Sequence, residues 1–258
     1  MNIIDFNEAG LPPLYNRTSK GDQPKWFFRG NWYKADSLGY EGLSEVVVSR
    51  LLRQTGDLEA ATYEPVCIRY NGREYMGCVS PDFKARDEEL VPLERMHLAF
   101  RGTSLAKARC IRYAVNLVEA VTGLRDAGRT LTAWLEADAF FLNEDRHTNN
   151  IAFLRNPEKN SWRFCPIYDN GLSLLSDLGD YPPDEKLSAL KKKVRAKPFA
   201  THFAAQVSAA ERLFGKQLCL GFGDAEIEAA LSGLPEYYDE KILIRVGNLI
   251  RTQTAALR

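Results

Sequence analysis

The sequence has no long apolar run, no paired cysteines and no excess of one charge, and each absence excludes a class of protein. No apolar run approaches the ~20 residues of a membrane-spanning helix. The N-terminal MNIIDFNEAGLPPLYN has acid and proline where a signal peptide has a basic and then an apolar run. Lysine plus arginine total 34, as do aspartate plus glutamate, so direct nucleic-acid binding and membrane association are not expected. We therefore expect a cytoplasmic protein.

The cysteines are few and scattered. No two of them form a C-x-x-C pair, and their odd number argues against a disulfide framework and against a zinc site. We expect buried thiols in a reducing compartment. An apolar fraction of 45% and an aromatic fraction of 11% exclude a disordered chain. The five positions are Cys67, Cys78, Cys110, Cys165 and Cys219.

The first third of the chain predicts strands around one helix. Aromatic-rich runs flank Gly30-Asn31, and two further strand-like runs flank Asn71-Gly72; both dipeptides are hairpin signals. Between these hairpins, apolar residues recur at helical spacing over 41–56 and end at a glycine.

The chain becomes helical from about Leu90. Residues 104–124 and 130–142 carry apolar stripes, residues 151–154 and 162–168 predict two short strands, and helical segments follow from Pro183. The pattern predicts an α+β fold with a small β-rich N-lobe (1–85) and a larger helical C-lobe (86–258). The join between two such lobes is a common place for a ligand cleft.

The strongest functional signal is N-E-D-R-H-T-N-N, followed after the two short strands by Y-D-N-G. It places Asp145 five residues before Asn150, with Asp169 at the start of D-N-G. Phosphoryl transfer from ATP needs a carboxylate that orients the attacking hydroxyl, and an amide oxygen and a second carboxylate that hold Mg²⁺. Protein kinases have the same Asp-to-Asn spacing before D-F-G. An ordinary polar loop of turn-forming residues is the alternative interpretation.

A lysine and a glutamate complete this pattern. Lys34 ends the first hairpin and Glu45 lies on the helix that follows, and kinases hold a phosphate-binding lysine with a helical glutamate. Lys25 competes for the role, but Lys34 alternates with Trp32 on one strand face and directly precedes the helix. The segment R-T-S-K-G-D-Q-P-K before the hairpin is a candidate phosphate loop through its backbone N–H groups.

Together these segments resemble the HipA-type serine/threonine kinases, including the related CtkA proteins. The resemblance rests on S-K-G-D-Q-P-K-W-F-F, the Lys34 strand, S-E-V-V-V-S-R-L-L, D-R-H-T-N-N and Y-D-N-G, from about Thr18 to about Leu175. It implies a two-lobed fold similar to that of protein kinases and phosphatidylinositol kinases. HipA has an extra N-terminal subdomain before the phosphate loop, which we expect to be absent here or supplied by a separate chain.

The resemblance also implies site residues. Asp145, Asn150 and Asp169 are the expected catalytic set, with Asn150 and Asp169 as the Mg²⁺ ligands. Ser19, or its neighbour Thr18, resembles a serine that such kinases phosphorylate on themselves; the added charge would expel the loop from the phosphate site. With the adenine near Met76 to Ser80, the expected ATP-binding residues are Ser19, Lys20, Gly21, Lys34, Glu45, Met76, Cys78, Ser80 and His147.

Two features allow more than one interpretation. His147 is either catalytic or, as we prefer, a structural residue of the loop. The basic run from Lys191 to Lys197 either docks an acidic substrate or a nucleic-acid-bearing partner, or forms a solvated helix face, which we favour.

The sequence thus predicts an ATP- and Mg²⁺-dependent kinase that phosphorylates serine or threonine of a protein substrate. Such a kinase would serve as the toxin of a toxin–antitoxin pair, with a cognate antitoxin as partner, or as a secreted effector. Two alternatives stay open. One is a lipid or small-molecule kinase, because D-R-H-x-x-N also resembles the phosphatidylinositol kinase loop. The other is a catalytically silent nucleotide-binding module that acts through partner contacts.

Overall fold

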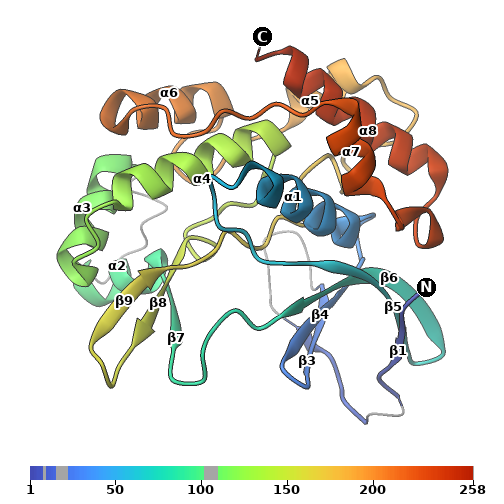
Figure 1. Ribbon diagram of the computed structural model, residues 1–258, viewed down its shortest axis with the longest axis horizontal. Coiled ribbons are helices and arrows are strands. Elements are labelled where there is room, and N and C mark those ends of the chain that lie inside the picture. The colour runs from blue at the N-terminus through green and yellow to red at the C-terminus, as the bar shows by residue number, and fades with distance from the viewer. Residues whose placement is uncertain (8–9, 16–22, 102–109, 258) are drawn as a thin grey trace.

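The computed structural model describes residues 1–7, 10–15, 23–101 and 110–257 of the chain. These residues form a small β-rich lobe and a larger, mostly helical lobe (Figure 1), which confirms the predicted α+β, two-lobed class. No helix in these ranges is both long and apolar enough to cross a membrane.

The small lobe is built on a six-stranded sheet with the order β1-β5-β6-β4-β3-β2. The strand β1 runs parallel to β5, and all other neighbours are antiparallel. The sequence analysis did not predict the short strands β1 and β2. The strands are β1 (Ile3–Asp5), β2 (Leu14–Tyr15), β3 (Pro24–Phe28), β4 (Asn31–Ala35), β5 (Glu64–Tyr70) and β6 (Arg73–Pro81).

Both hairpins turn through two residues with positive φ, the backbone conformation that matches the twist of the flanking strands. The second turn is Asn71-Gly72, with φ of 50° and 72°. The first is Arg29-Gly30, with φ of 50° and 78°, one residue earlier than the predicted Gly30-Asn31. Asn31 is instead the first residue of β4 and pairs with Phe28.

Helix α1 (Glu41–Thr55) lies directly on this sheet. A Cβ added to Gly42 would lie 2.5 Å from the carbonyl carbon of Gly77 on β6, so the two backbones touch without intervening side chains. The opposite side of the helix binds the segment after D-N-G. There Tyr40 Oη donates to the Leu174 carbonyl at 2.8 Å, and Ser44 Oγ donates to the Ser173 carbonyl at 2.9 Å.

The large lobe combines a three-stranded sheet, in the order β7-β8-β9, with helices. The strand β7 was not predicted, because its residues run without a break into a helix. The predicted helix over 104–124 begins at Ile111, and residues 104–109 lie outside the described ranges. The elements are β7 (Glu89–Pro92), α2 (Leu93–Arg101), α3 (Ile111–Thr122), α4 (Ala127–Phe141), β8 (Ala152–Asn156), β9 (Ser161–Phe164), α5 (Leu187–Lys193), α6 (Phe203–Phe214), α7 (Asp224–Leu231), the 3₁₀ helix η2 (Leu234–Glu236) and α8 (Glu240–Ala255).

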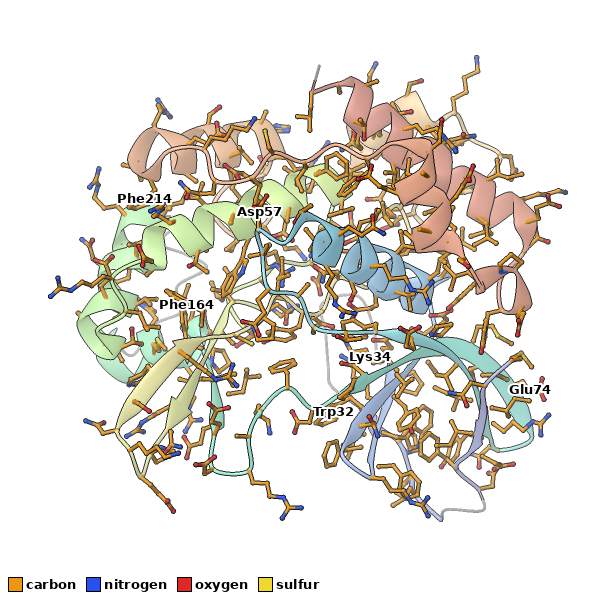
Figure 2. The ribbon with its side chains drawn as sticks, in the orientation of Figure 1. Trp32, Lys34, Asp57, Glu74, Phe164 and Phe214 are labelled. Carbon is orange, nitrogen blue, oxygen red and sulfur yellow. The ribbon has the colours of Figure 1, made fainter. Side chains whose placement is uncertain are left out.

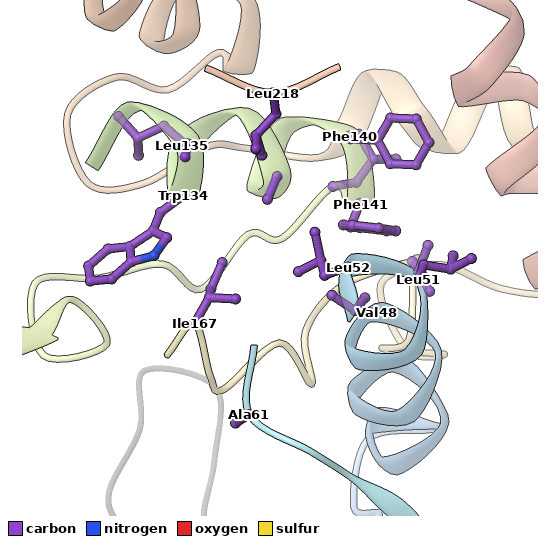
Figure 3. Packing of buried hydrophobic residues seen from close by; sticks show 14 of the residues in the cluster. Val48, Leu51, Leu52, Ala61, Trp134, Leu135, Phe140, Phe141, Ile167 and Leu218 are labelled. Atoms are coloured by element: carbon purple, nitrogen blue, oxygen red, sulfur yellow. The ribbon is translucent and has the colours of Figure 1, made fainter. Parts of the chain in front are cut away.

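The main hydrophobic core joins the two lobes through α1. Leu51 and Leu52 of α1 are fully buried in the same cluster as Phe140 and Phe141 of α4 (Figure 3). A smaller cluster around Phe6 lies against the opposite face of the six-stranded sheet. Helix α1 therefore packs against both the sheet and the core of the large lobe.

The cysteines are all free thiols. Cys67, Cys78 and Cys165 are buried as expected, whereas Cys110 and Cys219 are exposed. The expectation of buried thiols was wrong for these two: Cys110 directly precedes α3, and Cys219 lies in the segment between α6 and α7, so neither is on an inward-facing position of a helix or strand.

We predict that Gly42→Ala destabilises the protein. Alanine normally favours a helix by about 1 kcal/mol over glycine, but here the added methyl group meets the backbone of Gly77, and overpacking costs about 1–3 kcal/mol. Urea unfolding measures the change. The matched control is Gly247→Ala in α8, where the methyl group meets side-chain ends that can move. Equal stability for both variants would contradict the close approach of α1 and β6.

Candidate active site

The centre of the site is a buried lysine between two carboxylates. Lys34 Nζ on β4 donates to Glu45 Oε1 of α1 at 2.5 Å and to Asp169 Oδ1 at 2.7 Å. The Lys34 side chain is only 10% exposed and that of Glu45 only 1%. The Tyr63 ring adds a cation–π contact, 5.2 Å from Nζ. The structure therefore joins three sequence-predicted residues through one ammonium group.

Electrostatics keep both members of the Lys34–Asp169 pair ionised. Burial by itself would lower the pKa of Lys34, but the adjacent Asp169 and Glu45 carboxylates hold that pKa well above its usual value. Burial would likewise raise the pKa of Asp169, but Lys25 and Lys34 hold it well below its usual value. An ionised carboxylate and an ammonium group are the forms that bind a metal ion and phosphate oxygens respectively.

Lys25 lies beside Lys34 because the two residues are direct partners in the β3–β4 hairpin. Its Nζ is 3.9 Å from Asp169 Oδ1, beyond hydrogen-bond distance. The two lysines share this face of the sheet, but Lys34 is the one that contacts Glu45. Lys34 and Trp32, both labelled in Figure 2, are two residues apart on β4 and so share one face of the strand.

The D-N-G segment is held from both lobes. Glu45 Oε2 accepts a hydrogen bond from the backbone N–H of Asn170 at 2.8 Å, so one carboxylate binds both Lys34 and D-N-G. Asp169 itself has φ of +59°, in the left-handed region that aspartate tolerates better than most residues. This backbone conformation directs the residue toward Lys34 while Asn170 points into the large lobe.

A buried arginine joins the D-R-H-T-N-N loop to D-N-G. Arg146, which is 1% exposed, donates to Asp138 at 3.0 Å, to the Tyr168 carbonyl at 2.7 Å and to Asn170 Oδ1 at 2.7 Å. Its Nη1 also binds the Asn150 carbonyl at 3.0 Å. Sequence reasoning did not identify Arg146 or Asp138, although the arginine stands inside the D-R-H motif. A fully buried charge requires such partners.

The loop brings Asp145 and Asn150 together. Asn150 Nδ2 donates to the Asp145 carbonyl at 3.1 Å, so the side-chain oxygen of Asn150 is the atom that suits a metal ion. Asp145 Oδ1 accepts from Lys197 Nζ at 3.0 Å, and its Oδ2 lies 3.6 Å from His147 Nε2. Lys197 is a third residue whose place in the site the sequence did not indicate, since it belonged only to a basic run.

The predicted adenine-side residues lie on β6. The strand pairing places Cys78 opposite Lys34 and Ser80 opposite Trp32, so these residues share the Lys34 face of the sheet, and Met76 follows by alternation. After this strand, the ring of Phe83 contacts that of Tyr168, which directly precedes D-N-G, with 5.4 Å between the ring centroids. The other predicted residues, Thr18, Ser19, Lys20 and Gly21, lie outside the described ranges.

The donor set fits a magnesium ion. Asp169 and Asn150 offer a carboxylate and an amide oxygen, which are the hard oxygen ligands that Mg²⁺ prefers. The low pKa of Asp169 keeps its carboxylate ready for a cation. Histidine and cysteine, which favour other metals, are not needed in this set.

Comparisons with known proteins identify the fold in which this geometry occurs. No protein-family model and no curated protein matches the sequence. The proinflammatory kinase CtkA of Helicobacter pylori matches the structure with a TM-score of 0.68 at 15% identity, over 98% of this chain and 95% of CtkA. HipA of Shewanella oneidensis, from a toxin–antitoxin complex of HipA, HipB and operator DNA, matches with a TM-score of 0.60 at 14% identity, over 95% of this chain and 65% of HipA. The chain has the HipA/CtkA-like fold.

This result confirms the fold that the sequence motifs implied. At 14–15% identity the likeness establishes the architecture alone, and the chemistry is argued from the residues of the site. In this fold the strand with Lys34, the helix with Glu45 and the D-N-G segment come together where the two lobes meet.

We predict that Lys34→Met lowers the free energy of unfolding by about 3–5 kcal/mol, because it leaves the buried Glu45 carboxylate without its cation and Asp169 with only the more distant Lys25. Adding Glu45→Gln to this variant should restore part of the loss. Lys159→Met is the control, because Lys159 pairs with Asp87 but is 71% exposed, and exposed pairs contribute less than about 1 kcal/mol. Chemical denaturation that ranks the two single variants equally would refute the central role of Lys34.

Proposed function

We propose that the protein is an ATP- and Mg²⁺-dependent kinase that phosphorylates serine or threonine of a protein substrate. The observation that carries the proposal is the Glu45–Lys34–Asp169 linkage, with Asp145 and Asn150 on the loop that Arg146 ties to D-N-G. Phosphoryl transfer depends mainly on positioning and charge stabilisation, and this set supplies both.

Each residue then has a defined task. Lys34 binds phosphate oxygens of ATP, and Glu45 keeps the ammonium group in place. Asn150 and Asp169 hold Mg²⁺, which supplies positive charge against the phosphates when bound. The half-buried strand β6, with Met76, Cys78 and Ser80, covers the adenine from the side of the small lobe.

Asp145 acts on the acceptor. Its carboxylate orients the acceptor hydroxyl and takes the hydroxyl proton as the oxygen attacks the γ-phosphorus. The new phosphorus–oxygen bond forms as the bond between the γ-phosphorus and the bridging oxygen of ADP breaks. ADP leaves with the bonding electrons, and Asp145 then releases the proton to solvent.

The structural neighbours supply the biological part of the proposal. CtkA is described as a kinase, and HipA was solved with HipB in a toxin–antitoxin complex. We therefore include a toxin role with a cognate antitoxin, or an effector role, and self-phosphorylation at Ser19 or Thr18. We also propose that the boundary between the lobes lies between residues 85 and 86, in the segment between β6 and β7.

Mass spectrometry of the intact protein, incubated with Mg²⁺ and ATP, tests the proposal. We expect a gain of phosphate at Ser19 or Thr18, and a rate lower by at least about 100-fold in Asp145→Ala and Asp169→Ala, because proton transfer and metal binding are lost. Asp224→Ala, at an exposed aspartate that pairs with Arg251, should react like the wild type.

Other outcomes favour the alternatives. Phosphate transfer to phosphatidylinositol or a small alcohol, without any transfer to protein, would indicate a lipid or small-molecule kinase. ATP binding without turnover, in protein that is unmodified at the start, would indicate a silent nucleotide-binding module.

A further inference from the structure

A lysine from a distant segment binds the expected catalytic aspartate. Lys197 Nζ donates to Asp145 Oδ1 at 3.0 Å, although the two residues are 52 positions apart. The Asp145 side chain is 10% exposed and that of Lys197 is 37% exposed, so water only partly screens the pair. The contact is distinct from the Lys34 cluster, where the partners are Glu45 and Asp169.

The backbone around Lys197 is fixed by a buried glutamine. Gln206 of α6 is fully buried, and its Nε2 donates to the Lys197 carbonyl at 3.0 Å. Its Oε1 accepts from the backbone N–H groups of Phe199 and Ala200 at 3.0 and 3.1 Å. One side chain therefore satisfies three backbone groups of the segment between α5 and α6. A lysine whose side chain is only solvated would not need its backbone to be fixed by a buried side chain.

Resting on the function proposed above, we propose that Lys197 is a positioning residue for Asp145. Its ammonium group holds Oδ1 and thereby fixes the direction in which the carboxylate meets the acceptor hydroxyl. The terminal torsion of an aspartate is otherwise broad, so a carboxylate without a partner samples many orientations. A displacement of about 1 Å at a reacting group can cost roughly 100-fold in rate.

This role distinguishes Lys197 from the other lysines of the basic run. Lys192 and Lys193 are exposed, and Lys193 pairs with Glu185 on the same side of the lobe. Helix α5 ends at Lys193, so Lys197 does not belong to the helix face that the sequence suggested. The segment that follows the helix turns Lys197 toward the catalytic loop.

The test compares Lys197→Met and Lys197→Arg with the wild type. The assay is the rate of ADP release from Mg²⁺ and ATP with dephosphorylated casein as acceptor, beside Asp145→Ala as the inactive reference. We expect kcat of Lys197→Met to fall by about 10- to 100-fold while KM for ATP stays within about twofold. Lys197→Arg should recover most of the loss, because it keeps the charge and the reach.

Lys216→Met is the control, since Lys216 is an exposed lysine of the same lobe. All variants should unfold at the same temperature as the wild type, which separates positioning from stability.

Three results would overturn the inference. An unchanged kcat in Lys197→Met would show that Asp145 does not need Lys197, and a higher kcat would show that Lys197 shields Asp145 instead. A rise in KM for ATP alone would make Lys197 a nucleotide-binding residue. A different result would contradict the proposed function itself. If the wild type released ADP no faster than Asp145→Ala, both the kinase proposal and the role of Lys197 would be wrong.

Discussion

The structure depends on one buried positive charge. The Lys34 ammonium group lies between Glu45 and Asp169, which belong to different parts of the chain, and it is the cation that binds both carboxylates. Since Glu45 also binds the backbone of Asn170, the strand β4, the helix α1 and the D-N-G segment form one unit. The position of every other site residue is defined relative to this unit.

Helix α1 transmits this constraint to both lobes. Its glycine contact with β6 sets its distance from the sheet, and its leucines pack into the core of the large lobe. A sideways movement of α1 would break the Glu45 contact and disturb both packing surfaces together. The D-R-H-T-N-N loop is joined to the same unit by Arg146, whose buried guanidinium group binds Asn170 and Asn150. Two buried ionic centres, with Lys34 and Arg146, therefore organise the candidate site.

Much of this arrangement was predictable, because it is encoded locally. Hairpin dipeptides, the periodicity of α1 and the spacing from Asp145 to Asn150 are short-range patterns, and strand alternation placed Lys34 and Trp32 on one face. The features that could not be predicted from the sequence depend on contacts between distant residues. Nothing near Lys197 indicates that Gln206 will direct it to Asp145, and the short strands β1, β2 and β7 exist because a partner strand pairs with them. Residues 16–22, which include most of the expected phosphate loop, lie outside the described ranges.

The most direct test of the central claim is a crystal structure with Mg²⁺ and a non-hydrolysable ATP analogue. The Lys34 linkage predicts that the Lys34 ammonium group contacts the phosphates while still bound to Glu45, and that the metal ion is held by Asp169 and Asn150. Phosphates bound by Lys25 with the Lys34–Asp169 pair intact, or a nucleotide bound away from this cleft, would contradict it.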